Sequence, residues 1–85
     1  MEKLQSDLKY LEYLEDQLEC LSIHGKGIGA TFNDFSNHYR LLIDLSFITV
    51  IIFGLDVCSV HIDQIDEIQF SNDDKSAGIY LKGLS

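Results

Sequence analysis

The stretch LSFITVIIFGL at residues 45–55 decides the fold, because eleven residues pass without a formal charge in a strongly acidic chain. A helix that crosses a membrane needs about 20 apolar residues, and Asp44 and Asp56 bound this run. Its content of Ile, Val, Phe and Thr fits a pleated strand better than a helix. A run that is apolar on both faces indicates a strand covered on both sides, so another element must cover its second face.

A leucine stripe near the N-terminus is the candidate cover. Leucines recur there at steps of three and four residues, as on one face of an amphipathic helix: Leu4, Leu8, Leu11, Leu14, Leu18 and Leu21. Glycines within residues 25–29 then end the helical pattern. We therefore expect a helix over about residues 2–22, roughly 30 Å long, with its leucines packed on the strand at 47–53.

The rest of the chain is typical of short strands. They are expected from residue 28 and over YRLLIDL, FITVIIF, CSVHI, EIQF and IYLKGL. In VHIDQIDEIQF, a 3₁₀-like turn between two strands would place five apolar side chains in one core: Val60, Ile62, Ile65, Ile68 and Phe70. The predicted fold is α+β, with a long N-terminal amphipathic helix packed on a small, strongly bent antiparallel sheet or partly open barrel of four to five strands. We expect one domain over residues 1–85, with the β-rich part at about 28–84.

Small barrels of the SH3-like and Sm-like types have a tight turn of this kind between their last strands. The segment GIGATFNDFSNHYRLL resembles the first Sm motif, with Gly29, Asp34 and Asn37 in the places of its glycine, aspartate and asparagine. The Asp–Asn spacing is one residue shorter than usual in the family, and the glycine falls about one place early. The resemblance covers roughly residues 21–82, and Sm-like proteins often begin with a helix. It implies a homo-oligomeric ring that binds RNA.

The charge balance limits the partners. The net charge is −8, from 14 acidic and 6 basic residues, and nucleic-acid or anionic-membrane binding needs clustered Lys and Arg. We expect no direct nucleic-acid or membrane contact, but a basic protein partner suits this charge. Cys20 and Cys58 are too few for a disulfide framework, and the polar start MEKLQSDLKY does not read as a signal peptide. We expect a cytoplasmic protein with reduced thiols.

No catalytic signature is present in the sequence. GKGIG at residues 25–29 lacks the preceding strand and the GK[ST] ending of a phosphate-binding loop, so it reads as a helix-to-strand turn. His61 beside Asp63 reads as a solvated pair rather than general-base machinery. We predict that the protein is not an enzyme and needs no cofactor.

Two cysteines and two histidines have the residue types of a zinc site: Cys20, His24, Cys58 and His61. On a regular strand the odd spacing of Cys58 and His61 would place them on opposite faces. Separate core thiols and surface imidazoles are therefore the preferred interpretation, and we predict no metal. Whether the four side chains meet stays open at this point.

Acidic residues form the candidate partner-binding surface: Glu12, Glu15, Asp16, Glu19, Asp63, Asp66, Glu67, Asp73 and Asp74. The charge is densest in the predicted helix, since residues 1–22 carry −4 and residues 23–85 carry the other −4. Like charges four residues apart destabilise an isolated helix by about 0.2–0.5 kcal/mol per pair. A surface that tolerates this repulsion indicates a cationic partner, with solubility alone as the other explanation.

The sequence favours a small acidic protein-interaction module, an inhibitor or adaptor that docks on a basic protein. That partner could itself bind nucleic acid, because spaced carboxylates can imitate phosphates, as in small proteins of phage or mobile-element type. The alternatives are an Sm-like RNA-binding oligomer and a structural self-associating protein, including a homodimer formed through Tyr10 and Tyr13. Steps of three between Leu8, Leu11 and Leu14 depart from a heptad, which favours packing of the helix on its own sheet.

Overall fold

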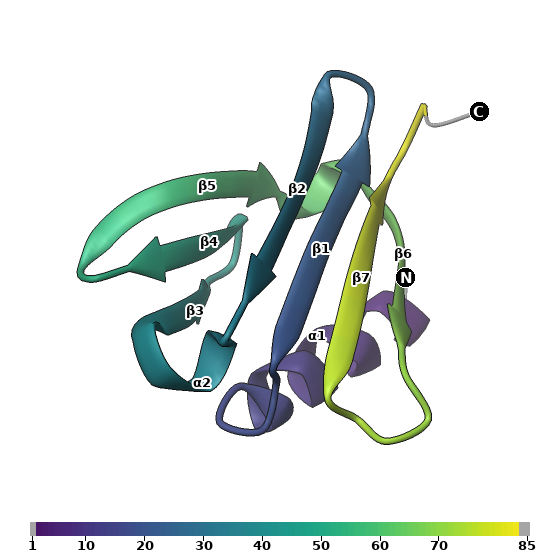
Figure 1. The fold of residues 1–85 in the computed structure, drawn as a ribbon. Coiled ribbons are helices and arrows are strands. Elements are labelled where there is room, and N and C mark those ends of the chain that lie inside the picture. The colour runs from purple at the N-terminus through teal and green to yellow at the C-terminus, as the bar shows by residue number, and fades with distance from the viewer. Residues whose placement is uncertain (1, 84–85) are drawn as a thin grey trace.

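The computed structural model describes residues 2–83, apart from the side chains of residues 36 and 37. Its elements are α1 (Glu2–Leu14), β1 (Cys20–Gly25), β2 (Ile28–Asn33), α2 (Phe35–His38), β3 (Tyr39–Ile43), β4 (Phe47–Ile52), β5 (Leu55–His61), the 3₁₀ turn η1 (Ile62–Gln64), β6 (Ile65–Phe70) and β7 (Ser76–Leu81). The strands form a four-stranded sheet in the order β2-β1-β7-β6 and a three-stranded sheet in the order β3-β4-β5 (Figure 1). The α+β class is confirmed. The expected single sheet or partly open barrel of four to five strands fits only in part, because one sheet has four strands but a second sheet has three, and neither sheet closes.

The N-terminal helix is shorter than predicted. α1 ends at Leu14. Leu18 and Leu21 are buried as predicted, but Leu18 lies in the turn after the helix and Leu21 lies in β1. Residues 20–25 hydrogen-bond to β2 on one side and β7 on the other. Pairing with two neighbouring strands therefore stabilises residues 20–25 more than an extension of the helix would. A longer helix would also have placed like charges four residues apart, which is unfavourable.

The four-stranded sheet is mixed rather than antiparallel throughout. β1 and β2 form an antiparallel hairpin across a two-residue turn, in which Gly27 has φ 77°. β7 returns from the far end of the chain and pairs parallel with β1, with Ile23 opposite Ile79. This parallel pair is the departure from the expected antiparallel sheet, and it joins the first and last strands at the centre of the sheet.

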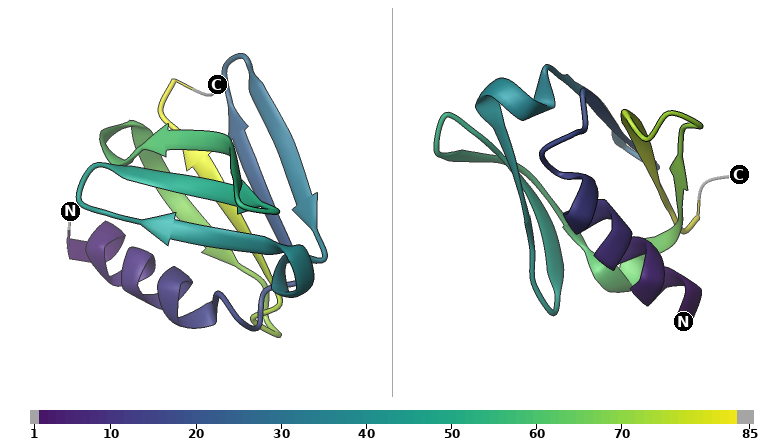
Figure 2. Two further views of the ribbon diagram at one scale, coloured as in Figure 1. Left: turned by 90° about the vertical axis from the view of Figure 1, so that its left-hand side faces the viewer. Right: turned by 90° about the horizontal axis from the view of Figure 1, so that it is seen from below.

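The apolar run that decides the fold is extended, as predicted. β4 lies between β3 and β5, and Ile48 and Val50 belong to the same buried cluster as Leu11 and Leu14. The expectation that the helix covers the second face of this strand is wrong. α1 contacts β6 and β3 and lies across one end of the space between the sheets (Figure 2, right). Phe47 on the opposite face of β4 is 42% exposed.

The predicted 3₁₀ turn is confirmed as η1, and it connects the two sheets. It follows β5 of the three-stranded sheet and leads into β6 of the four-stranded sheet. The apolar side chains predicted to share a core do so, with Phe70 only partly buried at its margin. The last strand ends at Leu81, and residue 84 of the expected β-rich part lies outside the described residues.

Candidate interaction surfaces

The fold brings two acidic segments to one end of the molecule. Residues 12–19 and 71–75 carry six acidic side chains and one basic one, and we call these two segments the acidic end. The Tyr10 hydroxyl donates to Asp74 Oδ2 at 2.6 Å, and Lys75 Nζ lies 3.4 Å from Glu19 Oε2. The end of α1 with the turn that follows it and the loop between β6 and β7 therefore lie together, at the bottom of Figure 1, and these two segments carry the acidic residues predicted there.

Several of these carboxylates form hydrogen bonds or ion pairs with other residues of the protein. Glu15 Oε2 accepts the N–H of Leu41 at 3.1 Å, and Glu15 Oε1 lies 3.7 Å from Arg40 Nη1. Asp73 Oδ1 accepts the Ser71 hydroxyl at 2.7 Å, and this bond contributes most to lowering the pKa of Asp73. Such contacts reduce what these groups can offer a partner.

Glu12 and Asp16 differ from their neighbours in the acidic end. Within the described part of the chain, neither side chain makes a hydrogen bond or an ion pair, and both are exposed. They are the members of the acidic end that are most available to a cationic surface.

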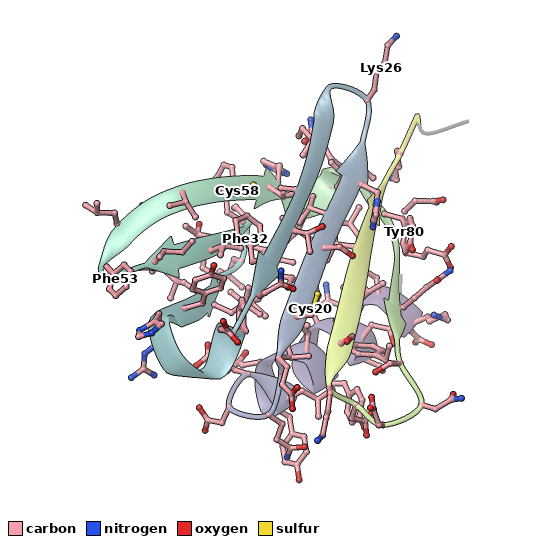
Figure 3. The ribbon with its side chains drawn as sticks, in the orientation of Figure 1. Cys20, Lys26, Phe32, Phe53, Cys58 and Tyr80 are labelled. Atoms are coloured by element: carbon pink, nitrogen blue, oxygen red, sulfur yellow. The ribbon has the colours of Figure 1, made fainter. Side chains whose placement is uncertain are left out.

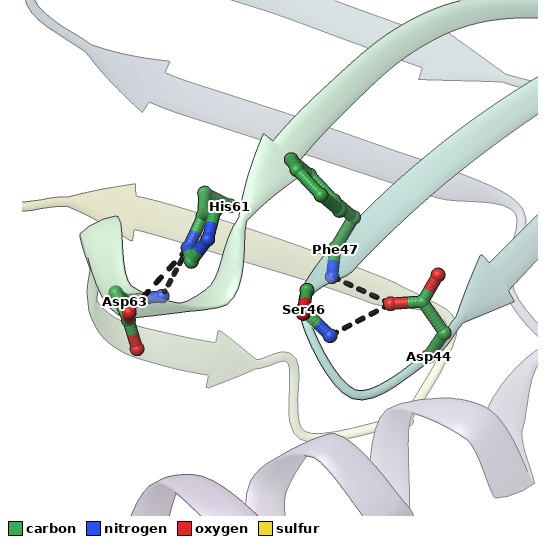
Figure 4. Close-up of polar contacts among 5 residues, drawn as sticks. All are labelled: Asp44, Ser46, Phe47, His61 and Asp63. Carbon is green, nitrogen blue, oxygen red and sulfur yellow. Dashed lines mark hydrogen bonds and ion pairs between the residues drawn. The ribbon is translucent and has the colours of Figure 1, made fainter.

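The remaining predicted acidic residues lie elsewhere. The N–H of Asp63 donates to His61 Nδ1 at 3.1 Å within η1 (Figure 4). Asp66 and Glu67 lie on β6 and line a cavity of about 240 Å³ beside α1. The predicted acidic surface is therefore divided, and only its helix-end and loop members are brought together.

The candidate metal ligands lie in separate surroundings. Cys58 pairs with Val50 on the buried side of β4, whereas His61 pairs with Phe47 on the other side. The predicted opposite-face placement of Cys58 and His61 is confirmed. Burial raises the pKa of the Cys58 thiol. Across residues 2–83 no group of three or more His, Cys, Asp or Glu side chains is placed to hold a metal.

The residues of the Sm-like pattern are placed in part. Gly29 lies in β2, and Asp34 follows that strand with φ 56° in the left-handed region. The side chain of Asn37 lies outside the described part of the structure. The pattern therefore gives no assembled site on the described residues.

Sequence reasoning missed an apolar surface on the β4–β5 hairpin. Four large apolar side chains of this hairpin are exposed, and we call the segment at residues 47–57 the apolar hairpin: Phe47, Phe53, Leu55 and Val57. Its tip extends away from the four-stranded sheet (Figure 1). The signal that could have found it was the doubly apolar run itself, because a face without a cover becomes surface.

The tip of the apolar hairpin has an unusual backbone. Phe53 and Gly54 form a two-residue turn between the paired residues Ile52 and Leu55, with φ values of 52° and 80°. This is the geometry of a type I′ turn, which favours Asn, Asp or Gly at its first position. A bulky residue at positive φ is a genuine outlier. Phe53 is nevertheless 75% exposed and points away from the body of the protein (Figure 3).

The other end of the apolar hairpin is fixed by a polar turn. Asp44 Oδ1 accepts the N–H groups of Ser46 and Phe47, both at 2.7 Å (Figure 4). These two bonds lower the pKa of Asp44. The ring of Phe47 then meets the ring of His61 edge-on, with centroids 4.8 Å apart. The hairpin is therefore anchored at its base and exposed at its tip.

The comparisons with known proteins give no relative. No protein-family model matches the chain, and no curated protein or solved structure is significantly similar to it. A separate structural finding is that no helix within residues 2–83 has the length and apolar character needed to cross a bilayer.

Proposed function

We propose that the protein is a small acidic protein-interaction module that acts as an inhibitor or adaptor on a basic protein. The apolar hairpin is the contact surface, and the acidic end attracts the partner. A partner that itself binds nucleic acid would present the required basic surface, and the carboxylates of the acidic end would then occupy places of phosphates.

The single observation that carries this proposal is Phe53. An aromatic residue at positive φ is strained, and Asn or Gly in the same turn would relieve that strain. Its ring lies 5.0 Å from the ring of His38, yet three quarters of its surface stays exposed. A strained and exposed aromatic side chain contributes little to folding, so we attribute its presence to contact with another protein.

The surroundings of Phe53 support the same interpretation. Leu55 is 70% exposed and Val57 is 48% exposed, with the carboxylate of Asp56 between them. Large exposed apolar side chains that gather within five residues of the chain, as Phe53, Leu55 and Val57 do, are typical of interaction sites, and aromatic residues are enriched among the anchors of interfaces. Long-range attraction from a net charge of −8 would raise the association rate with a basic partner more than it raises affinity.

Capture followed by titration tests the proposal. The immobilised protein is exposed to an extract of its source cells, bound proteins are identified, and the purified partner is titrated by calorimetry. We expect a basic partner whose affinity falls at least about tenfold, or 1.4 kcal/mol, in a Phe53→Asn/Leu55→Ser double variant. Leu45→Ser is the matched control, because Leu45 is 99% exposed in the β3–β4 turn and lies outside both the apolar hairpin and the acidic end. Equal losses in both variants would contradict docking through the hairpin.

A second pair of variants tests the acidic end. Glu12→Gln/Asp16→Asn removes two charges that make no hydrogen bond or ion pair in the described part of the chain, and it should slow association several-fold at low salt. Glu2→Gln/Asp66→Asn removes two charges elsewhere and is the control. If both double variants slow association equally, the net charge of the protein determines the association rate, and the acidic end has no special role. If the capture instead retains RNA on a ring-shaped oligomer, the Sm-like alternative replaces this proposal.

A further inference from the structure

The edges of the two sheets are protected to different degrees. The sheets end in four edge strands within the described chain: β2, β3, β5 and β6. An edge strand presents unpaired N–H and C=O groups that can pair with another chain, and proteins block such edges with charges, bulges or covering segments. An edge without these devices is therefore a candidate for strand pairing.

Two of these edges are blocked by charge or by α1. On β3, the carboxylate of Glu15 accepts the N–H of Leu41 and lies beside Arg40. β6 carries Asp66 and Glu67, has a register shift at its start, and packs beside α1. Neither edge is open to a second strand.

The edge of β5 is blocked by an irregular backbone. Its pairing with β4 shifts register between Val50 and Ile51, which leaves Val57 as an extra residue. A bulge of this kind twists an edge away from regular pairing. The charge of Asp56 lies at the same place in the strand.

The edge of β2 has none of these protections. Ile28–Asn33 contains no charged residue and no proline, and its pairing with β1 runs without a register shift. β2 is the outermost strand on the right of the left view in Figure 2, with no other segment beyond it along its length. Ile28 at the start of β2 is 36% exposed.

The hairpin geometry determines which backbone groups of β2 are free. A two-residue loop is closed by a hydrogen-bonded pair, here Gly25 and Ile28. Groups along β2 then alternate between β1 and the free edge. The residues that direct their N–H and C=O groups to the free edge are Gly29, Thr31 and Asn33.

We infer that β2 pairs antiparallel with β2 of a second copy, about a two-fold axis at Ala30. In this register Gly29 lies opposite Thr31 of the second copy, and both residues have outward-facing backbone groups. About four backbone hydrogen bonds form across such a pair. The two four-stranded sheets become one continuous sheet through the dimer.

Side chains select this register. Ile28 lies opposite Phe32 of the second copy, which joins two partly exposed apolar side chains on the same face twice over. Lys26 and Asp34, which flank β2 on its two sides, are brought close to each other at both ends of the pair. Neither of them has an ion-pair partner among residues 2–83, and Lys26 extends away from the body at the top of Figure 3.

The alternative register about Thr31 keeps the backbone pairing but loses these side-chain matches. It would place the carboxylate of Asp34 opposite Ile28, and Lys26 would lie beyond the end of the strand of the second copy. Charge complementarity therefore distinguishes the Ala30-centred dimer from the neighbouring register. This inference does not depend on the apolar hairpin, which lies in the other sheet.

Analytical ultracentrifugation of the full chain tests the dimer. We expect the mass to rise from 9.7 kDa toward twice that value between about 10 µM and 1 mM, the range of a small interface. Thr31→Pro removes an outward N–H, which an edge strand tolerates, and should weaken the dimer at least tenfold, whereas Thr31→Ala should not. A monomer at every concentration, or a dimer that Thr31→Pro leaves intact, would overturn the inference.

Charge exchange tests the register. Lys26→Glu and Asp34→Lys should each weaken the dimer several-fold, and the double variant should restore it because the two ion pairs are reversed. Phe53→Asn/Leu55→Ser should leave the dimer unchanged. A dimer that this last variant abolishes would place the interface on the apolar hairpin and overturn the inference.

Cross-linking keeps the test decisive where a charge variant fails to fold. In a Cys20→Ser/Cys58→Ala background, Ala30→Cys places two thiols at the two-fold axis, within reach of a disulfide. A mild oxidant should convert this variant to a covalent dimer faster than it converts Thr31→Cys. Faster cross-linking of Thr31→Cys would contradict the Ala30 register.

Discussion

The two sheets share one core, but their outer faces differ in polarity. The outer face of the four-stranded sheet is polar, and its side chains contact one another. His24 stacks on Tyr80 with ring centroids 4.8 Å apart, and His24 Nε2 lies 2.9 Å from Ser22 Oγ. The three-stranded sheet instead exposes apolar side chains, such as Leu42 and Phe47, to solvent.

This difference separates what the fold requires from what it permits. Both inner faces contribute to one buried cluster, in which Ile79 of one sheet and Val50 of the other are fully buried. A polar outer face is compatible with that core, so the apolar outer side of the three-stranded sheet is not needed for folding. Its apolar residues are the part of the sequence that folding does not account for.

The largest effect is expected where the two sheets and α1 meet. Leu11 is fully buried, and Leu11→Ala should lower the free energy of unfolding by about 2–5 kcal/mol, as measured by urea denaturation. Leu45 is 99% exposed in the β3–β4 turn, and Leu45→Ala should change stability by less than about 0.5 kcal/mol. Similar losses in the two variants would mean that α1 does not pack across the end of the two sheets as described.

A smaller effect is expected inside the four-stranded sheet. A Cβ atom at Gly25 would lie 2.7 Å from Leu81 Cδ1 and 3.0 Å from Leu81 Cβ. Gly25→Ala should therefore destabilise the protein by about 1–3 kcal/mol through overpacking. Gly29 has no atom within 4 Å of such a Cβ, so Gly29→Ala should be neutral or slightly stabilising. The melting temperatures of the two variants compare a crowded position and a position with open space in the same hairpin.

The smallest effect concerns acid. The pKa of Asp44 is lowered because its carboxylate accepts backbone N–H bonds. A carboxyl whose pKa is lower in the folded protein stabilises it above the unfolded value, near pH 4, and this stabilisation is lost as the pH falls through the folded value. The free energy of unfolding, measured by urea denaturation, should therefore fall from pH 6 to pH 3. Asp44→Asn should reduce that dependence, since its amide oxygen still accepts but cannot be protonated, and an unchanged dependence would contradict this role.

Local patterns predicted the strand at 47–53, the turn near Ile62 and the burial of Leu8, Leu11 and Leu14. These features depend on neighbours close in sequence. The end of α1 was predicted too late, because the leucine spacing continues through Leu18 while pairing with the distant β7 converts the next residues into β1. No local signal reports a strand partner more than fifty residues away.

The candidate sites also divide into features set by local sequence, which could be predicted, and features set by distant contacts, which could not. The opposite-face placement of Cys58 and His61 follows from strand periodicity and was predicted. The internal roles of Glu15 and Asp74 depend on contacts with Leu41 and Tyr10, far along the chain, and sequence spacing does not reveal them. The strain at Phe53 becomes visible only once the β4–β5 pairing fixes where the hairpin turns.

The unfolding free energy of Phe53→Asn, measured together with its affinity for a captured partner, tests most directly whether the apolar hairpin is kept for binding. Asn suits a type I′ turn, so we expect the variant to be more stable by about 0.5–1 kcal/mol while its binding weakens about tenfold. A variant that unfolds more easily than the wild type would mean that Phe53 supports the fold, and its exposed position would no longer indicate a docking surface.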